Sequence, residues 1–139
     1  MNKFSIVILL ALIVACWMQP SFASTNLVGK WSGVDSDGDT VTFVFNEDKS
    51  AEVKLEGVPL LSSTTMKNGH VEWSGDTGRD PVFLDIVIFV GSRENHRIQM
   101  LARFIDEHTL QIQLSRDMTT RPAGFELSKE VFQVQLTKQ

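Results

Sequence analysis

The chain has 139 residues and carries 13 Lys and Arg against 17 Asp and Glu, which gives a formal net charge of −4. Charges of both signs are interspersed, so binding to nucleic acid, which needs clustered cations, is not expected. The length suits a single folded domain. The only cysteine, Cys16, excludes an internal disulfide, so burial and backbone pairing must stabilise the fold.

The first 23 residues predict a secretory signal peptide. Lys3 precedes a mostly apolar run from Phe4 to Ala15, which is too short to span a membrane. Pro20 then breaks any helix, and small residues lead up to a cleavage site after Ala23. We therefore expect a signal peptide at 1–23, a folded domain at 24–139, and a periplasmic or secreted protein.

The same segment allows a second fate. Ile13-Val14-Ala15-Cys16 is similar to a bacterial lipobox, in which the cysteine is lipidated and becomes the new N-terminus. Lipidation at Cys16 would anchor the domain to a membrane, whereas cleavage after Ala23 would release it. The sequence leaves both fates open.

The rest of the chain predicts an all-β domain. Apolar and polar residues alternate with the period of two that is typical of half-buried strands, and no long helical period interrupts them. About eight such segments occur, with a further short one near 60–66. In chain order they begin at Trp31 and continue at Val41–Phe45, Ala51–Leu55, Val71–Trp73, Leu84–Val90, Ile98–Phe104, Leu110–Leu114 and Phe132–Leu136.

Short turn sequences separate these segments. Asp37-Gly38 and Asn68-Gly69 are typical of two-residue hairpin turns. Asn46–Lys49 and Asp106–His108 are polar links of hairpin length, and only Ser115–Glu130 is long. Short links favour an antiparallel meander, which hides its edges best by closing into a small up-and-down β-barrel.

The first strand resembles a known family. Gly29-Lys30-Trp31 is similar to the start of the lipocalin/calycin barrels, in which the Trp plugs one end and a basic residue of the last strand lies across it. The resemblance implies that role for Lys138. A closer likeness is to small bacterial lipocalin-like proteins of uncharacterised function, and it implies a fold and an exported habitat but no reaction. The motifs that carry it are Gly29-Lys30-Trp31, Asp37-Gly38, His108-Thr109-Leu110, Arg121-Pro122-Ala123-Gly124-Phe125 and the strand from Val131 to Leu136.

A barrel of this kind predicts a protein that binds a small apolar or amphipathic ligand. The large inward side chains would contact that ligand, or would instead fill so small a barrel completely. The expected ligand-binding residues are Phe43, Phe45, Trp73, Met100 and Phe104.

The most apolar strand suggests an alternative function. If Leu84, Ile86 and Ile88 face inward, then Phe83, Val87 and Phe89 form an apolar outer face. Segment Ser115–Glu130, a second copy of the chain or another protein of the cell envelope would cover it. The protein would then be a solid barrel acting as an inhibitor or assembly factor. Asp85 shares this face and is expected to meet water, because a lone buried charge is costly.

We find no catalytic, cofactor or metal motif. Asp35–Asp39 resembles part of a calcium loop, but its spacing fails and an acidic hairpin is the better interpretation. His70, His96 and His108 are expected on the surface rather than around zinc. The chain has no Gly-x-Ser-x-Gly elbow, so a non-enzymatic protein is predicted.

Overall fold

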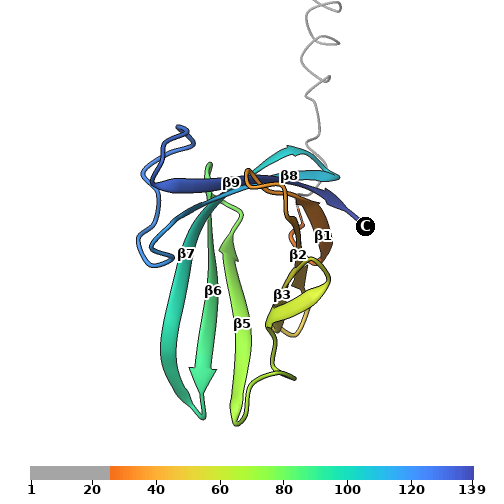
Figure 1. The fold of residues 1–139 in the computed structure, drawn as a ribbon, viewed down its shortest axis with the longest axis vertical. Coiled ribbons are helices and arrows are strands. Elements are labelled where there is room, and N and C mark those ends of the chain that lie inside the picture. The colour runs from red at the N-terminus through yellow and green to blue at the C-terminus, as the bar shows by residue number, and fades with distance from the viewer. Residues whose placement is uncertain (1–25) are drawn as a thin grey trace, which may run out of the picture.

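The computed structural model describes residues 26–139, and the predictions for the signal peptide, Ala23 and Cys16 fall outside them. Within that range the chain forms nine antiparallel strands and no helix (Figure 1). The strands are β1 (Gly29–Val34), β2 (Thr40–Phe45), β3 (Ala51–Leu55), β4 (Val58–Leu61), β5 (Gly69–Asp76), β6 (Val82–Val90), β7 (Arg93–Asp106), β8 (Thr109–Ser115) and β9 (Val131–Lys138).

All nine strands belong to one sheet that curls into a half-barrel, in the order β4-β3-β2-β1-β9-β8-β7-β6-β5. Each strand pairs with its neighbour in the chain except β4 with β5, and the first strand pairs with the last. The predicted all-β antiparallel fold is confirmed, but with nine strands rather than about eight, and the sheet remains a half-barrel instead of closing into the expected up-and-down barrel. The additional strand, β4, overlaps the short segment that the sequence placed near 60–66.

The direction of the strands explains why the sheet stays open between β4 and β5. Direction alternates along an antiparallel sheet, so the two edge strands of a nine-stranded sheet run the same way. A parallel pair needs a crossover of about a dozen residues or more, and the link between β4 and β5 covers only 62–68. Pro59 in β4 also has no amide hydrogen for a further partner.

The sheet edges approach each other at one point only. Ser50 and Glu72 form an isolated antiparallel bridge, and the Trp73 amide donates to the Lys49 carbonyl at 2.8 Å. These contacts join the start of β3 to the middle of β5. Beyond them β4 lies along β3, so the edges separate toward the other end of the half-barrel.

One end of the half-barrel is plugged by Trp31. Its side chain is fully buried, and the indole Nε1 donates to the Leu27 carbonyl at 2.8 Å. The Lys138 ammonium lies 5.3 Å from the centroid of the indole, and Phe104 meets the same ring edge-on at 6.2 Å. Gly29 is favoured here, because its φ of +138° is a conformation that residues with a Cβ rarely adopt. We call this the plugged end.

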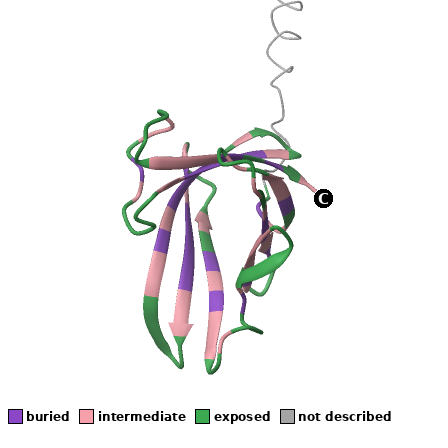
Figure 2. Cartoon of the chain, viewed as in Figure 1, coloured by how far each residue is buried: buried purple, intermediate pink, exposed green. Residues whose placement is uncertain are grey.

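The inward residues of most strands are buried, and the hairpin tips are exposed (Figure 2). In β6 and β7 burial does not alternate, because outward residues such as Val87 and Leu101 are buried as well. Inward residues of all strands except the short β4 contribute to one buried apolar cluster, with β4 residue Leu61 packed against it. The opposite end, which carries the β1–β2 turn at 35–39, is the cleft end. Its core is incomplete, and the candidate site lies there.

Candidate functional site: an apolar cleft

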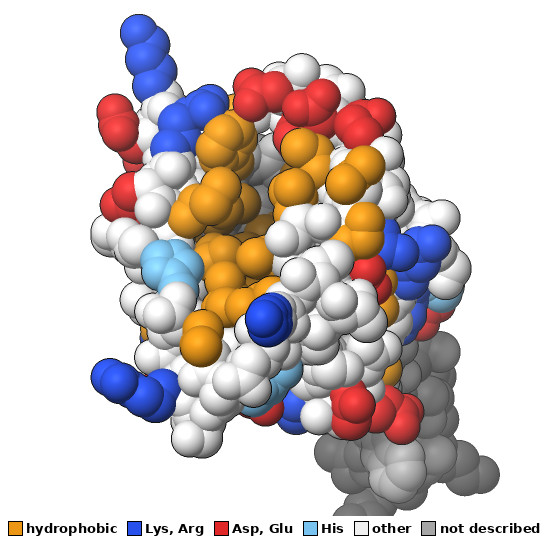
Figure 3. All heavy atoms as spheres, turned by 60° about the horizontal axis from the view of Figure 1, so that its bottom comes forward, with side chains coloured by type: hydrophobic (Ala, Val, Ile, Leu, Met, Phe, Trp, Pro, Cys, Tyr) orange, Lys and Arg blue, Asp and Glu red, His pale blue; other side chains and the backbone are white. Residues whose placement is uncertain are grey.

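The cleft end contains a hollow between β2, β3 and β4 on one side and β6, β7 and β8 on the other. A deep lobe of about 300 Å³ adjoins a rim lobe of about 290 Å³. Figure 3 shows this hollow as a depression lined with apolar side chains. The two lobes share five lining residues, so they form one continuous cleft. These are Phe43, Val53, Leu60, Leu114 and Met118.

The deep lobe is almost entirely apolar. It is completed by Leu61, Ile86, Ile88, Ile98 and Met100, and His96 is the only polar side chain among its lining residues. An apolar wall offers water few hydrogen bonds, so displacing water from the lobe is favourable. A volume near 300 Å³ is at the lower end of the range for small-molecule sites.

The rim lobe is polar on one side. Asp35, Asp37 and Asp39, all in the β1–β2 turn, line it, with Lys54 from β3 as its only cation. The Asp35 carboxylate accepts hydrogen bonds from the amides of Asp37 and Asp39, both at 2.9 Å. These bonds close a hairpin turn, as the sequence interpretation expected for the acidic segment.

The predicted ligand residues divide into two groups. Phe43 and Met100 line the cleft. Phe45 and Trp73 pack away from it, with ring centroids 5.4 Å apart, and the Trp73 indole donates to the Asn46 carbonyl at 2.9 Å. Phe104 packs on the plugging Trp at the far end. Inward orientation therefore holds for all five residues, but only two of them reach the hollow.

Sequence reasoning missed several lining residues. The alternation places Val53, Ile88, Ile98 and Leu114 on inward faces, but their side chains are smaller than the aromatic ones among the predicted ligand residues, so size alone does not indicate them. The sequence could have indicated them by their position along each strand. Inward residues at the same end as the Asp37-Gly38 turn lie at the end of the barrel opposite the Trp31 plug. Met118 lies in the loop after β8, outside any alternating segment, so the strand pattern could not indicate it.

The predicted partner face is partly covered by the chain itself, because Val87 is buried and Phe83 and Phe89 are half-buried. The guanidinium groups of Arg79 and Arg121 lie 3.7 Å and 4.1 Å from the Phe83 ring centroid. Val87 is 4% exposed, and Phe89 stacks on His70 at 4.6 Å. The sequence allowed three covers for this face. One of them, the segment between β8 and β9, contacts Phe83 through Arg121.

Asp85 differs from its prediction. It faces outward as expected, but it is only 8% exposed rather than hydrated. Arg121 Nη2 donates to its Oδ1 at 2.7 Å, and Arg97 Nη1 donates to its Oδ2 at 2.8 Å. The sequence argument assumed that a buried charge would be alone, and these two arginines remove that objection. Glu94 bonds the other side of Arg97 and raises the pKa of its guanidinium.

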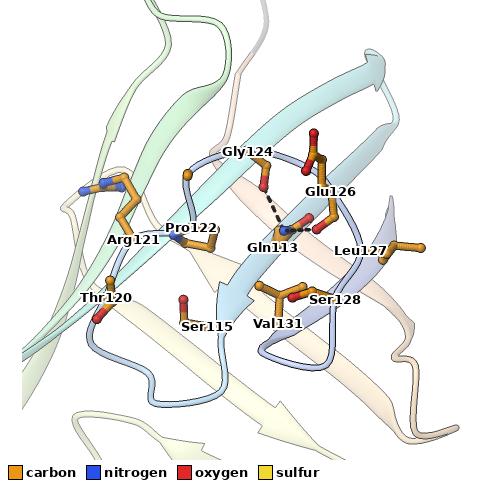
Figure 4. Close-up of a pocket in the computed structure, with 11 residues that line it drawn as sticks. Gln113, Ser115, Thr120, Arg121, Pro122, Gly124, Glu126, Leu127, Ser128 and Val131 are labelled. Carbon is orange, nitrogen blue, oxygen red and sulfur yellow. Dashed lines mark hydrogen bonds between the residues drawn. The ribbon is translucent and has the colours of Figure 1, made fainter.

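A second hollow, of about 540 Å³, lies between β8 and the β8–β9 loop, residues 116–130 (Figure 4). Gln113 points into it from β8 and is 1% exposed. Its Nε2 donates to the carbonyls of Gly124 at 2.8 Å and Glu126 at 3.1 Å, and its Oε1 accepts from Gln133. These bonds hold the loop against the sheet. The hollow lacks the continuous apolar lining of the cleft, so the cleft is the candidate site.

The loop also carries a perturbed carboxyl group. Hydrogen bonds from Thr120, then from Thr119, lower the pKa of Asp117 to about 2. Asp117 precedes Met118, which lines the cleft. The capped turn therefore fixes the segment that brings Met118 to the cleft.

The histidines do not form a cluster. His70 packs on the outer face and lies 3.2 Å from Glu72, His108 is in an exposed turn, and His96 lines the cleft. In residues 26–139 no group of three or more His, Cys, Asp or Glu side chains is placed to hold a metal ion. Over the same range, no helix has the length and hydrophobicity needed to cross a bilayer.

Comparisons with known proteins gave no match to the chain among protein-family models, curated proteins or solved structures.

Proposed function

We propose that this protein is a lipocalin-like binding protein that holds a small apolar or amphipathic molecule in the cleft of its half-barrel. The observation that carries the proposal is the continuous apolar cleft opposite the Trp31 plug. The contact of Lys138 with Trp31 agrees with the arrangement implied by the family resemblance. The cleft opens to solvent at its rim, so a ligand can enter without unfolding of the sheet.

A binding role is favoured over a reaction by the chemistry of the lining. Among the residues that line the deep lobe, only His96 offers a group for acid–base chemistry. No second polar group of that lobe lies beside it to orient it. The lobe can therefore bind and exclude water but has no set of groups arranged for proton transfer or nucleophilic attack.

We further propose that the protein acts in the periplasm or outside the cell, on the basis of the predicted signal peptide. Lipid attachment at Cys16 is the alternative to cleavage after Ala23. Mass spectrometry of the mature N-terminus distinguishes them, because lipidation leaves Cys16 as the first residue with added acyl mass.

The alternative role, an interaction protein acting through Phe83, Val87 and Phe89, has weaker support. Arg79 and Arg121 flank Phe83, and Val87 is buried within the described chain. An envelope partner or a second copy would have to displace Arg79 and Arg121 to reach Phe83.

The test uses the neutral fluorescent probe N-phenyl-1-naphthylamine, titrated into the purified protein. Val53 lines both lobes, so Val53→Trp fills the cleft. Val44 pairs with Glu52 on the other face of the same hairpin and is half-buried, so Val44→Trp is the matched control. We expect the wild-type protein to bind the probe saturably. Val53→Trp should weaken binding at least about tenfold, because the indole occupies the space in which the probe would contact the apolar wall. Val44→Trp should leave the affinity unchanged.

Two results would overturn the proposal. One is the absence of saturable probe binding to the folded wild-type protein. The other is equal weakening by Val53→Trp and Val44→Trp, which would indicate general destabilisation rather than a filled cleft. Circular dichroism of each variant checks that the sheet is retained.

A further inference from the structure

The rim of the cleft carries an unbalanced charge. Three carboxylates from one turn, those of Asp35, Asp37 and Asp39, face a single ammonium, that of Lys54. Lys54 lies 3.7 Å from Glu52, so its charge is already partly compensated. Figure 3 shows acidic side chains gathered along one edge of the hollow. The rim therefore has a negative potential where an occupant of the cleft would meet water.

Two of the three carboxylates are available to a ligand. Asp35 is engaged by the amides of its own turn. The carboxylates of Asp37 and Asp39 make no hydrogen bond or ion pair to any side chain or backbone group of residues 26–139. Their role is not explained by the turn, which Asp35 already closes.

The negative rim and the apolar lobe are parts of one space. Phe43, Val53 and Leu114 line both lobes, so an elongated molecule can extend from the deep lobe to the β1–β2 turn. Its buried end would contact Ile86 and Met100, and its outer end would lie beside the carboxylates. This arrangement suits an amphiphile with one apolar chain and one charged head.

We infer that the cleft selects single-chain amphiphiles with a cationic head group, of the alkylammonium type. This inference rests on the proposed function and specifies its ligand class. The apolar chain supplies most of the affinity, at about fourfold per buried methylene. Selectivity comes from the rim, because an ammonium beside Asp37 and Asp39 is attracted where a carboxylate or sulfate head is repelled.

The experiment measures displacement of the bound neutral probe by three dodecyl compounds below their micelle concentrations: dodecyltrimethylammonium, dodecyl sulfate and neutral dodecanol. At low salt we expect the ammonium to bind about tenfold tighter than the sulfate, with the alcohol between them. The preference should shrink as salt is raised, because the rim is open to solvent.

Three variants locate the effect. The double variant Asp37→Asn/Asp39→Asn should weaken dodecyltrimethylammonium by about threefold per carboxylate removed, as expected for exposed ion pairs, and leave binding of the neutral probe unchanged. Asp37→Asn alone removes one negative charge at the rim. Its matched control, Glu47→Gln, removes one negative charge far from the rim, in the β2–β3 turn at the plugged end. Glu47→Gln should leave all affinities unchanged.

The outcomes separate the two proposals. If the probe binds but the ammonium and the sulfate displace it equally, or if the double variant keeps the wild-type preference, the inference is wrong and the binding function stands. If Glu47→Gln reduces the preference as much as Asp37→Asn alone, net charge and not the rim is responsible, which also overturns it. If neither the probe nor any dodecyl compound binds, both proposals fail.

Discussion

The carboxylate of Asp85 connects three separate parts of the chain, and its removal is the sharpest test of how the outer face is held. Asp85 lies on β6, Arg97 lies on β7, and Arg121 lies in the β8–β9 loop. Arg121 also donates to the Met100 carbonyl at 2.6 Å. Asp85→Asn keeps the shape of the side chain but removes its charge and turns one acceptor oxygen into a donor that faces an arginine.

The expected loss follows from the burial of each partner. Breaking a buried ion pair from one side costs about 3–5 kcal/mol. The Asp85 and Arg121 side chains are 11% and 17% exposed, so this range applies best to their contact. Arg97 is 40% exposed and keeps its bond to Glu94, so its contribution is small. Asn retains one oxygen that can accept from an arginine, so we expect a loss below that range: Asp85→Asn should lower the free energy of unfolding by about 2–3 kcal/mol, or roughly 10 °C in Tm for a domain of this size.

Urea unfolding followed by circular dichroism measures this loss. Glu94→Gln is the matched control, because it removes an exposed carboxylate from the same Arg97 and should cost less than about 1 kcal/mol. A double-mutant cycle with Arg121→Gln should give a coupling energy of about 1–3 kcal/mol. A loss below about 0.5 kcal/mol for Asp85→Asn, or a coupling energy near zero, would show that the loop is held by other contacts.

Three further predictions address other parts of the chain. Gly33→Ala should prevent normal pairing of β1 with β9, because the alanine Cβ would lie 2.0 Å from the Gln135 carbonyl oxygen. We expect insoluble protein or lost protection of the β9 amides from hydrogen exchange. A native-like spectrum of the variant would contradict this prediction. Asp117 has a pKa lowered to about 2, so its stabilising effect on the loop is complete above its ordinary pKa of 3.8 and is lost as pH falls toward 2. Carboxyl NMR should show that titration, and a midpoint near 4 would refute it. Met118→Ala should weaken probe binding severalfold with little loss of stability, since Met118 lines the cleft and is 47% exposed. Phe45→Leu should lower the free energy of unfolding by about 1–2 kcal/mol and leave the probe affinity unchanged. The reverse pattern would place the site at the plugged end.

The sequence predicts which face of each strand is buried better than it predicts how far along the barrel a residue lies. Phe43 and Phe45 have the same parity and both point inward, yet only Phe43 reaches the cleft. Parity depends on local alternation, which is visible in the sequence. Depth depends on strand tilt and on which turn lies at which end, and these follow from the pairing of all nine strands.

The sequence named the segment Ser115–Glu130 as one possible cover of the outer face but could not choose it over a second copy or another protein. The β8–β9 loop has no apolar period, so nothing in it indicates the face on which it packs. Its path is set by single contacts, those of Arg121 with Asp85 and of Gln113 with the Gly124 carbonyl. Such contacts between distant residues have no signature in one sequence without its folded context.

The cleft itself follows from the strand that the sequence identified least clearly. β4 is short, contains Pro59 and lacks alternation, so it was only a marginal prediction. If β4 is left out, eight of the nine strands remain, and β3 and β5 become antiparallel neighbours, already joined through Ser50 and Glu72. Those eight strands would close the barrel and cover the hollow. β4 instead pairs with the free edge of β3 and runs parallel to β5. The link between β4 and β5 is too short for a parallel pair, so the two strands stay unpaired. β4 thereby holds the edges apart and contributes Leu60 and Leu61 to the wall of the cleft.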